Sequence, residues 1–187
     1  MSETFDTAAR KERVVLVAVD CGDENDVEKS LNELQELADT AGAEVVGRLI
    51  QNREKIHPAT YIGKGKIEEL REMIRNVQAD TVISDDELSP AQLGNLEEML
   101  ETKIIDRTVL ILDIFADRAS TKEGKIQVEL AQLRYRSSRL IGLGRSLSRM
   151  GGQSSGLGIG NKGPGEKKLE LDRRLIKDRM TFLYKEV

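Results

Sequence analysis

The sequence predicts an α/β fold, in which a small four-stranded parallel sheet flanked by helices is followed by a long antiparallel helical hairpin with a glycine-rich tip. Three observations support this expectation. In the first half of the chain, short apolar runs alternate with amphipathic helical patterns. In the second half no strand pattern is found, and leucine or isoleucine recurs every seven residues. Residues 150–166 interrupt this repeat and contain seven glycines in 17 residues.

Four segments are expected to form the sheet. Val14–Asp20 is a continuous apolar run, VVLVAVD, which is typical of a strand buried on both faces. The other three strands, in chain order, are Ala43–Gln51, Asp80–Asp85 and Lys103–Asp106. Because a helical pattern separates each strand from the next, we expect parallel strands with helices on both faces.

Three helical patterns lie between these strands. The first, Asp26–Ala41, has leucines on one face and stops before Gly42, a residue favoured just after helix C-termini. The second is Lys66–Val77. The third begins at Ser89 and Pro90, because serine is a good N-cap and proline suits the first turn.

Two further helices are expected beyond residue 107. Their seven-residue repeats consist of Ile126, Leu133, Leu140 and Leu147 before the glycine-rich loop, and Leu169, Ile176 and Leu183 after it. Two helices with matching apolar seams predict a hairpin. The apolar run Val109–Ala119 either covers the sheet or begins the first of these helices. We therefore predict a sheet subdomain at residues 1–107 and a hairpin subdomain at 108–187, with the glycine-rich loop at 150–166.

The two halves differ in charge. Residues 1–106 carry 12 Lys and Arg against 24 Asp and Glu, whereas residues 107–187 carry 17 against 9. Phosphates attract a basic helical surface and repel an acidic one, so the second half is the candidate for binding nucleic acid. The alternative is that the two halves simply attract each other.

The sequence also indicates where the protein acts. No apolar stretch approaches the roughly 20 residues that span a bilayer, and the N-terminus lacks the apolar centre of a secretory signal. The single cysteine, Cys21, excludes an internal disulfide and favours a reducing compartment. We expect a cytoplasmic monomer.

No motif for nucleotide hydrolysis is found. Residues 158–163 match GxGxxG, but that motif needs a preceding strand and an immediate helix, whereas a basic helix precedes it here. The Gly-Lys pairs all fail the Walker A pattern GxxxxGK[ST], so we predict no catalytic residue, no metal site and no cofactor in this chain.

Two groups in the first half are weaker candidates. Lys64 and Lys66 stand at the start of a predicted helix, where free amides and lysines could bind an anion or a nucleotide; the alternative is an ordinary turn. Four acidic residues follow the first and third strands and could hold Mg²⁺ as in a phosphoacceptor domain: Asp20, Asp85, Asp86 and Glu87. A solvated acidic loop is the alternative. As the only histidine, His57 is expected to shape its loop.

The basic hairpin is the stronger candidate. Arginines follow its first helix and lysines surround its tip: Arg134, Arg136, Arg139, Arg145, Arg149, Lys162, Lys167 and Lys168. Glycine permits close backbone approach, and the loop has no aromatic residue to stack on bases, so we expect contacts with the shape and phosphates of folded RNA. A solvated helical face with a flexible linker is the alternative. The predicted RNA-binding residues are Arg145, Arg149, Gly158, Gly160, Asn161, Lys162, Gly163, Gly165, Lys167 and Lys168.

Several dense motifs resemble the N-terminal region of HflX-family GTPases. They are HPATYIGKGKIEEL, DELSPAQLGNLEEML, KGPGEKKLELDRRLIKDRM and the segment from Lys103 to Leu140, within a resemblance that runs from about Pro58 to Met180. The resemblance implies a small α/β subdomain, a helical hairpin and a separate GTPase domain that would bind GTP and Mg²⁺. Because the chain stops at Val187, within the second helical repeat and before any Walker A motif, we expect that domain to follow residue 187; a stand-alone homologue without it is the alternative.

The resemblance also implies a function. Proteins of this family associate with the large ribosomal subunit, split or rescue stalled ribosomes, and direct the hairpin tip toward the RNA of the peptidyl-transferase region. The tip would comprise Gly151, Gly152, Gly158, Gly160, Asn161, Lys162, Gly163, Pro164, Gly165 and Glu166. Two departures concern charge: Lys162 replaces the usual arginine, which removes bidentate reach, and Lys167-Lys168 replaces a Thr-Gln pair. Some members of the family bind ATP through this region, for which Lys64, Lys66 and residues 85–87 are candidates.

Overall fold

The computed structural model describes residues 10–22, 26–150 and 164–186, with side chains described outside residues 141–168. The elements in chain order are β1 (Arg13–Asp20), α1 (Val27–Thr40), β2 (Glu44–Asn52), α2 (Lys64–Val77), β3 (Thr81–Ser84), α3 (Pro90–Leu100), β4 (Lys103–Asp106), α4 (Arg107–Arg118), α5 (Lys122–Met150) and α6 (Pro164–Glu186). Among these residues, no helix combines the length and apolar character needed to cross a membrane.

The four strands form one parallel sheet in the order β2-β1-β3-β4, which confirms the predicted fold class. The chain moves outward from β1 to β2, then crosses to β3 and β4 on the other side. The direction of winding therefore reverses between β1 and β3. In open sheets of this kind, the carboxyl ends of the strands at that point form a crevice.

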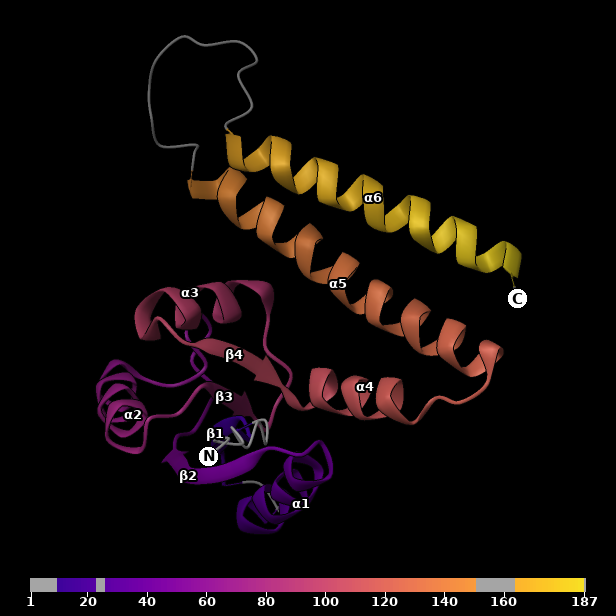
Figure 1. The fold of residues 1–187 in the computed structure, drawn as a ribbon. Coiled ribbons are helices and arrows are strands. Elements are labelled where there is room, and N and C mark those ends of the chain that lie inside the picture. Colours follow the sequence, from indigo (N-terminus) through magenta and orange to yellow (C-terminus); the bar gives the residue numbers. More distant parts are fainter. Residues whose placement is uncertain (1–9, 23–25, 151–163, 187) are drawn as a thin grey trace, which may run out of the picture.

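Helices cover both faces of the sheet, because alternate residues of each buried strand point to opposite sides. Val15 and Val17 of β1 pack with the buried residues of α2 and α3, while Val14 and Leu16 pack with those of α1 and α4. Figure 1 shows the two helix layers on either side of the sheet. Burial of each such side chain contributes about 1.5–3 kcal/mol to folding.

Local signals explain where the helices of this layer begin. Ser89 and Gln92 form a reciprocal capping box at α3, and Asp26 caps α1 with its side chain. α2 begins at Lys64, two residues before the sequence pattern suggests, because the amide of Gly63 is held by Gln51 Oε1 at 2.8 Å and the helix starts directly after it.

The segment between sheet and hairpin forms a helix of its own. α4 begins directly after β4, with Asp106 as its N-cap, and its residues Leu110 and Ile114 are buried against the sheet. Of the two alternatives for this apolar run, covering the sheet is therefore correct. The first helix of the hairpin starts only at Lys122.

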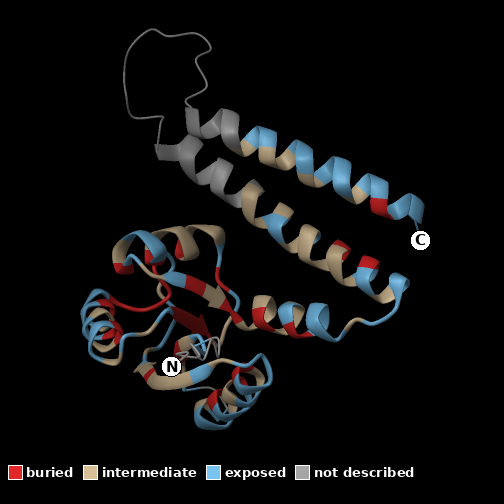
Figure 2. Ribbon diagram, viewed as in Figure 1, coloured by how far each residue is buried: buried red, intermediate tan, exposed pale blue. Residues whose placement is uncertain are grey.

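The hairpin consists of α5 and α6. Ile126 and Leu130 of α5 pack with Leu183 of α6 in a small third core, with Leu133 and Met180 partly buried beside them. Polar contacts flank it: Arg179 forms two hydrogen bonds to the Glu129 carboxylate at 2.7 and 3.0 Å. Figure 2 shows how little of α6 is buried compared with the sheet.

The helices on either side of the glycine-rich segment extend into the range predicted as loop. α5 extends through Met150, and α6 begins at Pro164, so residues 164–166 form the first turn of a helix instead of loop. Proline favours this first position because it has no amide hydrogen to leave unsatisfied and its backbone angle is already helical. Residues 151–163 lie outside the described part of the chain.

Candidate nucleic-acid interface

The hairpin lies beside the sheet as an arm. α5 contacts α3, α4 and α6. The end of α5 and the start of α6 lie together at one end of the arm, while the start of α5 and the end of α6 lie together at the other, where Lys122 Nζ is 2.9 Å from Glu186 Oε2 (Figure 1). The glycine-rich segment therefore connects the helices at the end remote from residue 186.

Five of the ten predicted RNA-binding residues belong to the described helices and fall at this end. Arg145 and Arg149 belong to the final turns of α5, and Gly165, Lys167 and Lys168 to the first turns of α6, where only the backbone is described. The other five lie outside the described residues: Gly158, Gly160, Asn161, Lys162 and Gly163.

Two of the arginines that the sequence suggests for an RNA-facing surface have partners inside the protein. Arg134 donates to the Tyr184 hydroxyl at 3.0 and 2.5 Å, which ties α5 to α6. Arg139 points toward the sheet and pairs with a buried carboxylate. Arg134 and Arg136 are nevertheless both exposed, so they keep the expected surface position. The expectation of a surface position is therefore wrong for Arg139 alone, because the face of α5 that carries it is turned toward the sheet.

The partner of Arg139 is Asp106, which is fully buried. Its Oδ1 accepts from the Val109 amide at 3.1 Å, and its Oδ2 accepts from the Leu88 amide at 3.1 Å. The Tyr135 hydroxyl and the Arg139 guanidinium also donate to Oδ2. One carboxylate thus links the end of β4, the start of α4, the loop before α3 and the middle of α5.

Tyr135 and Arg139 support each other as well. They are four residues apart on α5, so they share one face, and the guanidinium carbon lies 4.4 Å from the ring centroid. Burial and the neighbouring Asp106 carboxylate raise the pKa of the Tyr135 hydroxyl, which keeps it a hydrogen-bond donor. Arg139 also donates to the Leu88 carbonyl at 3.1 Å.

The candidate anion site at α2 is partly occupied by the protein itself. Lys64 and Lys66 stand in the first turn, and Lys66 Nζ lies 2.6 Å from Glu69 Oε2 one turn later. The N-cap, Gly63, has the Arg53 guanidinium close by and gives its amide to Gln51. Both lysines stand at a helix start, as predicted, but Lys66 already pairs with Glu69 of the same helix.

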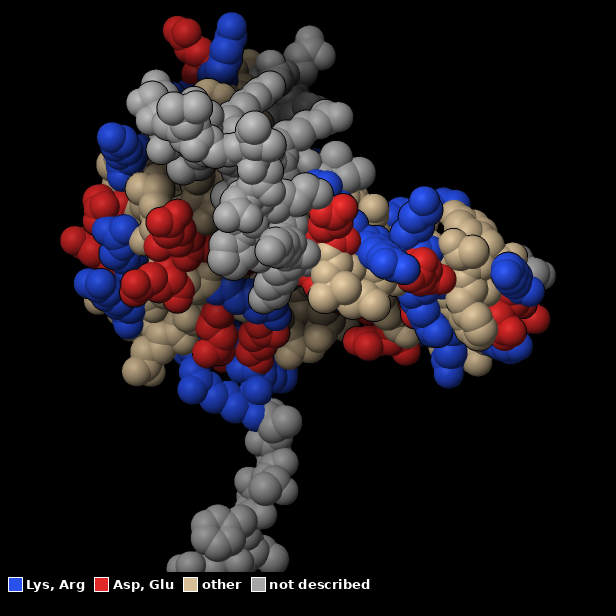
Figure 3. Space-filling view, turned by 90° about the horizontal axis from the view of Figure 1, so that it is seen from above, with Lys and Arg blue, Asp and Glu red and all other residues tan. Residues whose placement is uncertain are grey.

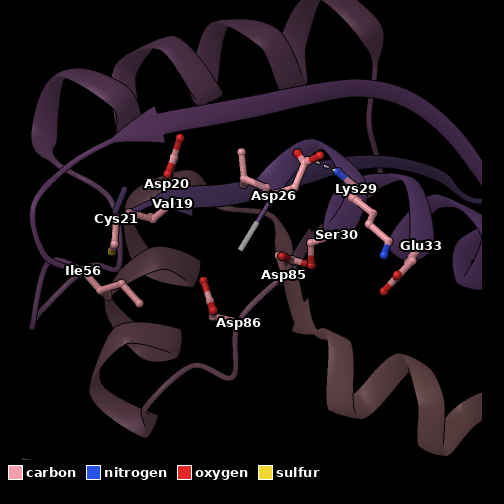
Figure 4. A pocket seen from close by; sticks show the side chains of 11 residues that line it. Val19, Asp20, Cys21, Asp26, Lys29, Ser30, Glu33, Ile56, Asp85 and Asp86 are labelled. Atoms are coloured by element: carbon pink, nitrogen blue, oxygen red, sulfur yellow. Dashed lines mark hydrogen bonds between the residues drawn. The ribbon is translucent and has the colours of Figure 1, made fainter. Parts of the chain in front are cut away.

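The acidic residues surround a cavity of about 540 Å³ at the carboxyl end of β1 and β3. Figure 4 shows Asp20, at the end of β1, and the consecutive residues Asp85 and Asp86, after β3, around this opening. Each has a protein partner: Asp20 accepts from the Gly22 amide at 2.8 Å, Asp86 from the Tyr61 hydroxyl at 2.6 Å, and Asp85 from Arg107. Among the described residues no group of carboxylates, histidine or cysteine is arranged to hold a metal ion.

The loop before α2 owes its shape to two of its residues. His57 Nδ1 accepts from the Thr60 amide at 3.2 Å, so the histidine shapes the loop as expected. Tyr61 adopts a positive φ of 66°, unusual for a residue with a side chain, and its ring is buried. Burial and the Asp86 carboxylate raise the pKa of its hydroxyl. Gln92 of α3 holds the loop by donating to the His57 carbonyl at 2.9 Å.

Four residues of these networks are not predicted from the sequence as functional: Asp106, Arg107, Tyr61 and Tyr135. For Asp106 the sequence pattern predicts only the last position of a strand. Two signals mark it: it directly precedes a helix, where aspartate is a preferred cap, and Tyr135 and Arg139 have the spacing of helical neighbours. Neither signal identifies the two segments as partners, because they are about 30 residues apart in the chain.

Family comparisons agree along most of the chain. Residues 28–116 match the family described as GTP-binding GTPase N-terminal, and residues 118–187 match the GTP-binding GTPase Middle Region. The boundary between them falls at the end of α4. This division groups α4 with the sheet, as its packing does.

Curated relatives and solved structures extend this result. The chain is 62% identical to the GTPase HflX of Lacrimispora saccharolytica over 100% of this chain and 43% of the relative, and 44% identical to that of Escherichia coli over 94% and 40%. It therefore spans about two fifths of the length of these relatives. A GTP-binding protein from Sulfolobus solfataricus, solved in complex with GDP, has the same fold, with a TM-score of 0.61 and 21% identity over 94% of this chain and 44% of that one. The chain belongs to the HflX family of GTPases and contains the N-terminal and middle regions of that family.

Proposed function

We propose that this chain is the ribosome-binding region of an HflX-type GTPase, which uses the glycine-rich end of its hairpin to contact RNA of the large ribosomal subunit. The full-length protein would act in the cytoplasm as a monomer and help to split or rescue stalled ribosomes. The GTPase domain of the full-length protein would bind GTP and Mg²⁺.

The observation that carries the proposal is the concentration of positive charge where the two hairpin helices meet the glycine-rich segment. Residues 145–168 contain five cations, Arg145, Arg149, Lys162, Lys167 and Lys168, against one acidic residue, Glu166. The described part of the arm is different. On the face seen in Figure 3, cationic and acidic side chains alternate over it, and several are paired with each other. An RNA phosphate backbone is therefore attracted chiefly to one end of the hairpin.

Charge reversal at that end tests the proposal. We expect Arg149→Glu and Lys162→Glu each to weaken binding to purified large ribosomal subunits by about tenfold or more, because each loses a phosphate contact and adds repulsion. Lys55→Glu, an equal charge change at an exposed residue of the sheet subdomain, is the matched control and should bind like the unaltered chain. Equal affinity of all four proteins would contradict the proposal.

A second function is favoured by a separate observation. Leu171, Leu175 and Phe182 share one face of α6 and are 56%, 58% and 53% exposed. Such an apolar stripe indicates a contact surface, and the GTPase region of the longer relatives is its candidate partner. We expect Leu175→Asp to alter the GTPase rate of a full-length protein while leaving the fold of this region intact. An unaltered rate would remove this second candidate.

The alternative of a metal-dependent phosphoacceptor or nucleotide-binding site in the sheet subdomain has less support. Its carboxylates form hydrogen bonds with Gly22, Tyr61 and Arg107, so they are not free to surround a cation. We therefore favour RNA binding by the hairpin.

A further inference from the structure

We infer that Asp106, Tyr135 and Arg139 form a rigid joint that fixes the direction of the hairpin relative to the sheet. In this role they are positioning residues for the RNA contact, although none of them lies at the glycine-rich end. The effect on RNA binding rests on the function proposed above, whereas the rigidity of the joint does not.

The first argument concerns specificity of geometry. Apolar contacts between two helices are non-directional, so they restrict a small sliding or rotation less than hydrogen bonds do. A fully buried carboxylate differs, since moving its donors leaves an unpaired charge in the interior at a penalty of several kcal/mol. Asp106 receives donors from both α4 and α5, so these helices can keep it satisfied only in a narrow range of orientations.

The second argument is that the cluster is poorly designed for stability alone. Buried ion pairs add little stability compared with apolar residues of the same size. Among the described residues, Nε of Arg139 is also buried without a hydrogen-bond partner, which costs about 1–3 kcal/mol. A group that is expensive to bury and gives little net stability is explained better by the orientation that it specifies.

The third argument is leverage. Arg139 lies near the middle of α5, and the helix continues to Met150, which at about 1.5 Å per residue places its end about 16 Å away. A rotation of about 20° at the joint would move that end by about 6 Å, more than the length of a hydrogen bond. α6 would follow, because Arg173 donates to the Leu140 carbonyl at 2.6 Å, next to the joint.

Distance measurements by pulsed electron paramagnetic resonance test the joint directly. On a Cys21→Ser background, spin labels at Glu98→Cys in α3 and Lys177→Cys in α6 report the separation of sheet and arm; both positions are exposed. Tyr135→Phe keeps the ring and removes the hydroxyl, and Arg139→Lys keeps the charge and loses the planar reach. We expect each to broaden or shift the distance distribution by several ångströms.

Two controls separate a positioning role from a structural one. Tyr184→Phe removes a tyrosine hydroxyl that also binds an arginine of α5 but lies away from the joint. Leu34→Ala lowers stability through the sheet core without touching the arm. Both should keep the distribution of the unaltered chain. If Tyr135→Phe lowers the melting temperature but leaves the distribution unchanged, the joint is only structural and the inference is wrong; this holds even if Arg139→Lys fails to fold.

Binding to large ribosomal subunits completes the test. We expect Tyr135→Phe to lose affinity severalfold, whereas Tyr184→Phe does not, and Lys162→Glu should lose affinity with an unchanged distance distribution. A broadened distribution with full affinity would overturn the positioning role. Failure of the unaltered chain to bind subunits would instead contradict the proposed function. The distance measurements alone would then decide whether the joint is rigid.

Discussion

At the scale of single residues, the neighbours Asp106 and Arg107 connect the end of β4 to different helices. Asp106 holds α5, while its neighbour Arg107 turns the other way and donates to the Ser30 carbonyl of α1 at 2.8 Å and to Asp85 after β3. Because these consecutive side chains reach different helices, the end of β4 is a point at which α1, α4 and α5 are all linked to the sheet.

Removing the Asp106 carboxylate alone should be costly even though the intact cluster adds little net stability, because the buried Arg139 would lose its partner. We expect Asp106→Ala to lower the free energy of unfolding by about 3–5 kcal/mol, because it removes the cap of α4 and leaves Arg139 buried without a counter-charge. Urea denaturation followed by circular dichroism measures this. Asp117→Ala, at an exposed position on the same helix, is the control, and a loss below about 1 kcal/mol for Asp106→Ala would contradict the description of the network.

Glu12 gives a prediction about pH. Its hydrogen bonds with Thr81 and Lys103 hold its pKa below the ordinary value, so its ionised form is favoured by folding. The stabilisation is fully present above the pKa of the unfolded chain and is lost as the pH falls through the lower pKa of the folded state. Glu12→Gln should thus be less stable than the unaltered chain at pH 7, and the gap should close in acid.

Unfolding midpoints measured from pH 7 down through the range of carboxylate titration would reveal this change. Glu36→Gln, an exposed glutamate on α1, serves as control. A gap for Glu12→Gln that stays constant with pH would show that the hydrogen bonds do not depend on its charge.

At the scale of elements, the sequence allowed most of the sheet subdomain to be predicted. Apolar runs and caps locate strands and helices because they depend on near neighbours, and Lys103–Asp106 was assigned with the bounds observed. Predictions that depend on distant partners were less successful. The inward orientation of Arg139 depends on a carboxylate in another element, and the start of α6 at Pro164 was hidden by the glycines around it. The RNA-binding residues at the tip stay a prediction.

The hairpin is the element held by the smallest core. Leu183 is 3% exposed and Leu171, on the same helix, is 56% exposed. We expect Leu183→Ala to lower the stability of the hairpin by about 2–5 kcal/mol, because it leaves a cavity beside Ile126 and Leu130. Leu171→Ala should have almost no effect. Hydrogen exchange should locate the loss of protection in α5 and α6 alone, and equal effects of the two substitutions would contradict this packing.

At the scale of the whole molecule, the separation of charge predicts a salt dependence. If the five cations of residues 145–168 all contact phosphates, the logarithm of the binding constant should fall against the logarithm of salt concentration with a slope of about −4. Neutralising one of them, as in Lys168→Gln, should reduce the slope by about 1. Titrations of large subunits at several salt concentrations measure it, and a slope near zero would mean that phosphates are not the target.

The pairing of Lys122 with Glu186 has a consequence for how such proteins can change over evolution. The start of α5 and the end of α6 lie side by side, so the length of the two helices can change without moving these two ends apart. Removing one heptad from α5 beyond Leu140 and one from α6 before Arg173 would retract the tip by about 10 Å. The contact of Arg139 with Asp106 and the pairing of Lys122 with Glu186 would stay in place. Insertion or deletion of matched heptads can therefore adjust the distance between the tip and the sheet subdomain without altering the sheet.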